Sequence, residues 1–152
     1  MSWIFNGQVA TAEQLQDVRP FLSTEQVAFA EQCWLEEQLP AQVLELCRLR
    51  IAQLYQCDAE LAMRREEAVA AGLTETKIAR LTHWFEDTMF TEWEKACIEA
   101  AELYAQSPPA ITEALAAEII DLMGEPAYIA LLDALAVFNG FALQGKPIAS
   151  EA

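Results

Sequence analysis

The stretch LPAQVLELCRLRIAQLYQCDAELAMRREEAVAAGLTETKIARLTHW, residues 39–84, decides the fold of this chain. Its first part, residues 40–55, begins with a proline suited to a first helical position and is nearly apolar all round. Either Cys57 or Asp58 is placed to begin the next helix, and Gly72 is placed to end it. The stretch therefore predicts two consecutive helices, of which the first is buried on every side.

Start and stop signals divide the rest of the chain in the same way. Alanine, leucine, glutamate and glutamine dominate and β-branched residues are few, which favours helices throughout. Thr91 and Glu94 form a predicted capping box, and Gly124 ends a further helix. We predict an all-α fold, a compact bundle of about seven helices. The additional predicted helices cover residues 11–18, 23–38, 75–88, 91–106, 113–123 and 126–145.

The composition limits the size, the partners and the compartment of the protein. With 152 residues, 54% of them hydrophobic, the chain is long enough for one domain with a substantial core. A net charge of −15 argues against nucleic acid and against anionic membrane surfaces as partners. The longest apolar stretch, residues 127–143, contains an aspartate and is short for a membrane span. The start lacks a secretion signal, so we expect a cytoplasmic location and reduced cysteines.

Four residues near the junction of the two predicted helices form a candidate site. Glu45 lies on the apolar helix, and Cys57 follows at the start of the next one. Glu60 and Arg64 come one and two turns later, on one face of that helix. A helix N-terminus favours the reactive thiolate, whereas the neighbouring carboxylates oppose it. Cys57 is thus either a reactive thiol or a cap residue, and Glu60–Arg64 either a solvated pair or part of a buried network.

The same residues carry a resemblance to a known family. The stretch resembles the core of the alkylhydroperoxidase D and carboxymuconolactone decarboxylase family, whose antioxidant branch has an upstream Glu followed by Cys-x-x-Cys-x-x-x-His. Glu45 and Cys57 match the upstream Glu and the first Cys. Glu60 stands in place of the second Cys and Arg64 in place of the His. The framework segments LELCRLRIAQL and EEAVAAGLTETKIARL match as well, and the resemblance continues more weakly to residue 144.

The resemblance implies a fold, an assembly and an activity. It implies an alkylhydroperoxidase D-like core over residues 39–145, with a helical extension packed on it at 1–38 and a frayed tail at 146–152. Members of the family assemble as trimers or hexamers, so we expect a homotrimer or homohexamer. In the antioxidant branch the second Cys reduces an alkyl hydroperoxide and the first resolves the product as a disulfide, a peroxiredoxin-type activity.

Three hypotheses of function follow from the altered motif. In the first, dithiol peroxide reduction is lost, and Glu45, Glu60 and Arg64 line a pocket that is structural or binds a small anionic ligand. In the second, Cys57 is a thiol peroxidase that an external thiol regenerates. In the third, Arg64 holds a substrate carboxylate and a glutamate moves a proton, as in a cofactor-free decarboxylase or lactone enzyme.

Whether the chain is an enzyme at all stays open between these three hypotheses. We expect no cofactor and no metal, because the single histidine, His83, shares no ligand spacing with a second histidine or a cysteine.

Overall fold

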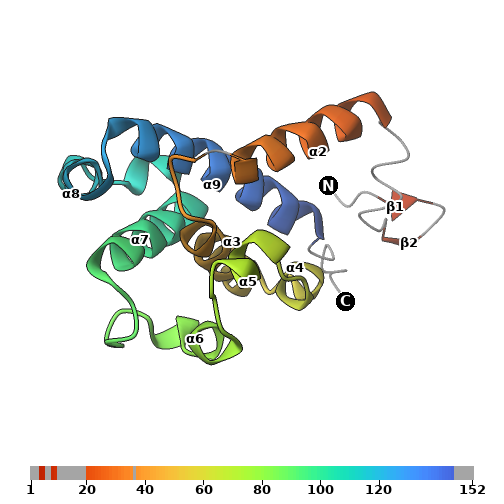
Figure 1. Ribbon diagram of the computed structural model, residues 1–152. Coiled ribbons are helices and arrows are strands. Elements are labelled where there is room, and N and C mark those ends of the chain that lie inside the picture. The colour runs from red at the N-terminus through yellow and green to blue at the C-terminus, as the bar shows by residue number, and fades with distance from the viewer. Residues whose placement is uncertain (1–3, 6–7, 10–19, 36, 146–152) are drawn as a thin grey trace.

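A computed structural model of the chain describes residues 4–5, 8–9, 20–35 and 37–145 (Figure 1). The predicted helix at 11–18 and the predicted tail at 146–152 lie outside these residues. The predicted all-α fold is confirmed. Its helices are α2 (Pro20–Leu35), α3 (Ala41–Tyr55), α4 (Asp58–Ala62), α5 (Glu66–Ala70), α6 (Glu75–Ala79), α7 (Glu92–Gln106), α8 (Glu113–Met123) and α9 (Glu125–Gly145), with 3-10 turns η1 (Leu81–His83) and η2 (Pro108–Ala110). The only β-structure among the described residues is an antiparallel pair of two-residue strands, β1 (Ile4–Phe5) and β2 (Gln8–Val9).

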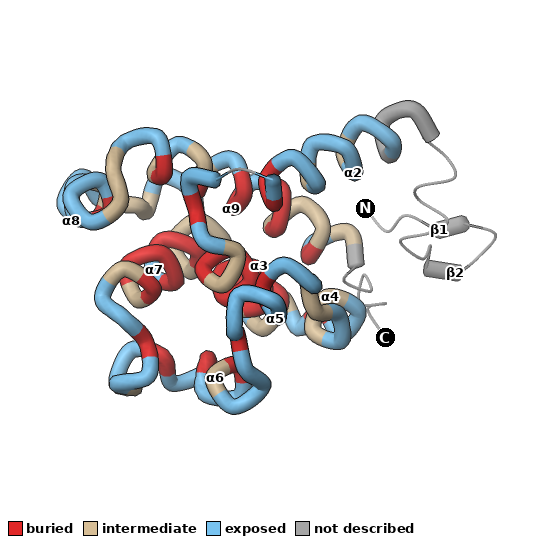
Figure 2. Tube along the Cα trace, in the orientation of Figure 1, coloured by how far each residue is buried: buried red, intermediate tan, exposed pale blue. Residues whose placement is uncertain are grey.

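Helix α3 is the central element of the bundle and is buried along most of its length (Figure 2). It packs mainly on α7 and α9. One core lies between these three helices and includes Val43, Cys47 and Leu131. A second core covers another face of α3 and includes Leu46 and Leu49. A helix with two apolar faces needs partners on both sides, so the near-continuous apolar sequence of α3 is explained by these two cores.

Most of the predicted helix ends occur where the sequence places them. The Thr91 hydroxyl accepts from the Glu94 backbone N–H, and the Glu94 carboxylate accepts from the Thr91 N–H, which completes the capping box of α7. The hydroxyl of Thr112 caps α8 in the same way. Gly72 and Gly124 have φ of 99° and 88°, the left-handed region that a glycine reaches without steric cost. Local capping by hydroxyl groups and the backbone freedom of glycine therefore fix these boundaries.

The single helix predicted from Cys57 to Gly72 is wrong. The chain forms two short helices, α4 and α5, separated by an extended segment at residues 63–65. Met63 has φ −83° and ψ 151°, and Arg65 has φ −78° and ψ 128°, so neither continues a helix. The helix predicted at 75–88 is likewise short: α6 ends at residue 79 and the 3-10 turn η1 follows it.

Helix α9 is long and apolar, yet it is not buried on every side. Judged by length and composition alone, the segment Glu125–Gln144 could cross a membrane, and 39% of it is buried in the protein. The core helix of a soluble protein passes the same test. Packing on α2 includes Trp34 against Phe138, with ring centroids 5.6 Å apart. The solvent-facing side carries Ile129, Asp133 and Leu143.

Candidate functional site

A buried ion cluster lies where α3 faces the connection between α4 and α5. Glu45 is 0% exposed and Arg48, one turn later on α3, is 4% exposed. Arg48 donates from Nη2 and Nε to the two carboxylate oxygens of Glu45, at 2.7 and 2.8 Å. Burial alone lowers the pKa of Arg48, but its hydrogen bonds with Glu45 and the charges of Glu45 and Glu60 raise the pKa above the usual value. The guanidinium is therefore a permanent buried cation.

The remaining N–H groups of Arg48 donate hydrogen bonds to Glu60 in α4 and to Met63 directly after it. Nη1 donates to the carboxylate and to the backbone carbonyl of Glu60, at 2.9 and 2.8 Å. Nη2 also donates to the carbonyl of Met63 at 2.9 Å, and the Arg65 backbone N–H donates to Glu45 at 3.1 Å. Arg48 thus makes five hydrogen bonds, as many as a guanidinium has N–H groups.

This cluster accounts for the break between α4 and α5. The carbonyl of Met63 and the N–H of Arg65 bond to side chains from α3 rather than to a helical partner. A buried cation and carboxylate need such partners, because an unpaired charge away from water is costly. The chain therefore gives up a helical turn at residues 63–65 and satisfies the buried ion pair.

Arg64 does not lie in the buried cluster, contrary to the expected Glu45–Glu60–Arg64 network. Its Nε and Nη2 donate to the carboxylate of Glu75, at 2.7 and 3.1 Å, and Nη1 donates to the carbonyls of Leu61 and Met63. The hydrogen bond from Arg64 holds the pKa of Glu75 below its usual value. The i, i+4 geometry predicted for Glu60 and Arg64 requires a continuous helix, and α4 ends before Arg64.

Cys57 is the single sulfur at the family's motif positions. Of the two predicted cap residues, Cys57 and Asp58, it is Cys57 that is the N-cap of α4, but its side chain makes no capping hydrogen bond and is 0% exposed. No disulfide joins the described cysteines, Cys33, Cys47, Cys57 and Cys97. A peroxide must reach sulfur in order to react with it, so full burial disfavours direct oxidation of Cys57 in the folded protein.

Two other thiols lie in the core between α3 and α7, and burial makes both poor nucleophiles. Burial, together with the nearby Cys97 and Glu94, raises the pKa of Cys47 well above its usual value. Burial, with Glu94, raises the pKa of Cys97 to about 12. The Cys97 Sγ lies 3.5 Å from the Met123 Sδ. Neither thiol is set up to replace the missing second cysteine of the motif.

Sequence reasoning missed Arg48, which is the central residue of the cluster. The signal was present, because Glu45 and Arg48 stand at i, i+3 on a helix whose apolar residues predict burial. Opposite charges one turn apart on a buried helix need each other as partners. His83 is exposed on η1, and among the described residues no group of three or more His, Cys, Asp or Glu side chains is arranged to hold a metal ion.

The family assignment follows from comparison with known proteins. The model of the carboxymuconolactone decarboxylase family matches residues 24–103, which is more than half of the chain. The chain belongs to this family. A crystal structure from Agrobacterium tumefaciens, described as a protein of unknown function and a proposed antioxidant defence protein AhpD, has a TM-score of 0.74 and 16% sequence identity. The alignment covers 94% of this chain and 99% of that one, and at this identity it shows the fold alone. No curated protein matches the chain.

Proposed function

We propose that this carboxymuconolactone decarboxylase family member has lost dithiol hydroperoxide reduction. In this proposal the motif region has a structural role and holds the α4–α5 segment on the central helix α3. The supporting observation is the set of five hydrogen bonds from Arg48, which join Glu45 on α3 to Glu60 and Met63. The cluster fastens the α4–α5 segment to the central helix. In this proposal charge pairing at these positions replaces sulfur chemistry.

The geometry gives less support to an anionic ligand in this cluster. Every N–H of Arg48 already has an acceptor, so an incoming carboxylate must displace Glu45 or Glu60. Arg64 is engaged with Glu75 and with two backbone carbonyls. The acid–base hypothesis needs a free cation and a free base side by side, and the cluster offers neither.

A peroxidase assay tests the proposal. Wild-type protein is mixed with tert-butyl hydroperoxide and dithiothreitol, and peroxide loss is compared with that of Cys57→Ser and of buffer alone. We expect the three rates to agree, because the family's reacting sulfur is absent and Cys57 is buried. Steady turnover by the wild type overturns the proposal. If that turnover disappears in Cys57→Ser, the thiol peroxidase hypothesis takes its place.

We also propose that the protein is cytoplasmic and assembles as a homotrimer or homohexamer. The four cysteines are free, which fits a reducing compartment. The assembly is supported by large apolar side chains that the single chain leaves exposed, such as Phe85, Leu35 and Val69, which are 73%, 67% and 53% exposed. Sedimentation equilibrium at several concentrations measures the mass directly. A monomer at the highest concentration contradicts the assembly.

A further inference from the structure

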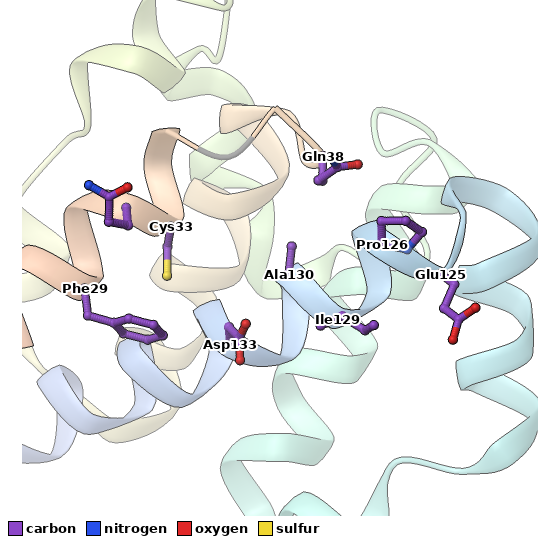
Figure 3. A pocket seen from close by; sticks show the side chains of 9 residues that line it. Phe29, Cys33, Gln38, Glu125, Pro126, Ile129, Ala130 and Asp133 are labelled. Atoms are coloured by element: carbon purple, nitrogen blue, oxygen red, sulfur yellow. The ribbon is translucent and has the colours of Figure 1, made fainter.

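A groove of about 430 Å³ lies between α2 and the first half of α9 (Figure 3), and no residue of the buried ion cluster lines it. This is the size of a site for a small organic molecule. Its lining residues are Phe29, Gln32, Cys33, Gln38, Glu125, Pro126, Ile129, Ala130 and Asp133.

Part of the groove lining is apolar and exposed to water. Phe29 from α2 and Ile129 from α9 are 50% and 53% exposed, which is high for side chains of this size. Pro126 and Ala130 extend the apolar lining along α9 (Figure 3). A ligand with an apolar body would cover these side chains and remove their surface from water.

The polar groups of the groove carry one sign of charge only. Glu125 and Asp133 line it from α9, and the side-chain carboxylate of neither has an ion pair or hydrogen bond among the described residues. They stand eight residues apart, which is about 12 Å along a helix. Gln32 and Gln38 add amide oxygens as further hydrogen-bond acceptors.

No cation on the neighbouring elements neutralises these carboxylates. The sequence holds no lysine, arginine or histidine in residues 20–47 or in residues 96–145, the ranges that include α2, α8 and α9. Arg65 does approach α2, but it pairs with Glu31 and lies 4.7 Å over the ring of Trp34. Neither Glu31 nor Trp34 lines the groove.

We propose that this groove binds an amphipathic organic cation, a molecule with ammonium groups on an apolar body. The carboxylates of Glu125 and Asp133 would hold the ammonium groups, and Phe29 and Ile129 would contact the apolar body. The exposed ring of Phe29 also attracts a cation over its face. A second copy of the chain is a poorer occupant, because two chains of charge −15 repel each other at an acidic surface without cations.

Titration calorimetry with a matched pair of probes tests the proposal. The binding probe is diaminooctane with an amine at each end, whose length is close to the rise of about 12 Å between the two residues along the helix. Octanediol is the neutral control of the same length. We expect saturable binding of the diamine and none of the diol. The double variant Glu125→Gln and Asp133→Asn should weaken diamine binding at least about tenfold, and Phe29→Ala should weaken it less.

A second double variant separates the groove from general charge attraction. Glu92→Gln with Glu99→Gln removes two exposed, unpaired carboxylates two turns apart on α7, which changes the net charge by the same amount. Binding within about twofold of wild type supports a groove site. Equal weakening by both double variants overturns it. The proposal also fails if no saturable binding occurs, or if the groove variant abolishes self-association instead, which would assign the groove to a second copy.

Discussion

Two arginines in the motif region, Arg48 and Arg64, show how differently the same side chain behaves in two settings. The side chain of Arg48 is 5% exposed and its partner Glu45 is 1% exposed. The side chain of Arg64 is 29% exposed and its partner Glu75 is 71% exposed. A buried pair controls the local fold because neither ion can return to water without unfolding. An exposed pair exchanges readily with solvent and constrains little.

The largest predicted effect comes from removing the buried cation. Arg48→Met should lower the free energy of unfolding by about 3–5 kcal/mol, because it leaves Glu45 buried and uncompensated. The same change frees the carbonyls of Glu60 and Met63 from their hydrogen bonds. Urea denaturation followed by circular dichroism measures the loss. A loss below about 1 kcal/mol would mean that Arg48 contributes no more to stability than an exposed ion pair such as that of Arg64.

A double variant shows whether the loss comes from the stranded charge. Glu45→Gln combined with Arg48→Met removes both ions from α3 and keeps similar side-chain volumes. We expect this double variant to be more stable than Arg48→Met alone, since no carboxylate is then buried without a cation. If the two are equally unstable, the contribution of Arg48 is packing rather than charge.

Much of the fold can be predicted from the sequence, because the ends of several helices are set by residues that lie close together in the chain. The capping box of Thr91 and Glu94, the Thr112 cap and the glycines that end α5 and α8 are all formed by residues within one turn of each other. The apolar sequence of α3 predicts a helix buried on every side, and in the single chain nine of its 15 residues are buried while Leu54 is 40% exposed.

The break after α4 could not be predicted in this way. Nothing in the sequence of residues 57–72 forbids a continuous helix, since it has no proline or interior glycine. The break depends on Arg48 from another helix, which binds the carbonyls of Glu60 and Met63. The predicted role of Arg64 depended on that continuous helix and is wrong for the same reason.

The core thiols give a second large effect, on reaction rate. With its pKa raised to about 12, Cys97 should react with iodoacetamide at mildly alkaline pH roughly a thousandfold more slowly than an ordinary cysteine. The raised pKa means that the fold favours the neutral thiol. The contribution of the Cys97 thiol to stability is therefore complete below its pKa in the unfolded chain. It is lost as the pH rises toward its pKa in the folded protein. Peptide mapping by mass spectrometry, with urea-unfolded protein as control, measures the labelling. Rapid labelling of folded Cys97 contradicts the burial.

A smaller, stabilising effect is expected at the end of the helix that carries the buried cluster. Gln56, the C-cap of α3, has φ 53° and ψ 45°, and the Cys57 N–H bonds to the Ala52 carbonyl as in a Schellman motif. Glycine is the usual residue in this left-handed conformation. Gln56→Gly should raise the free energy of unfolding by about 0.5–1 kcal/mol. Lower stability in urea denaturation would mean that the glutamine side chain makes a contribution larger than its backbone strain.

The smallest effect is predicted at the exposed arginine. Arg64→Ala should lower Tm by no more than about 2 °C, because its pair with Glu75 faces solvent. Arg64 lowers the pKa of Glu75, so the wild-type advantage should be present above the usual glutamate pKa and vanish as the pH falls through the folded value. Added salt should reduce it as well. Differential scanning calorimetry at neutral and acidic pH measures both trends. An effect that is as large as that of Arg48→Met, or that is independent of pH and salt, would show that exposure does not separate the two arginines.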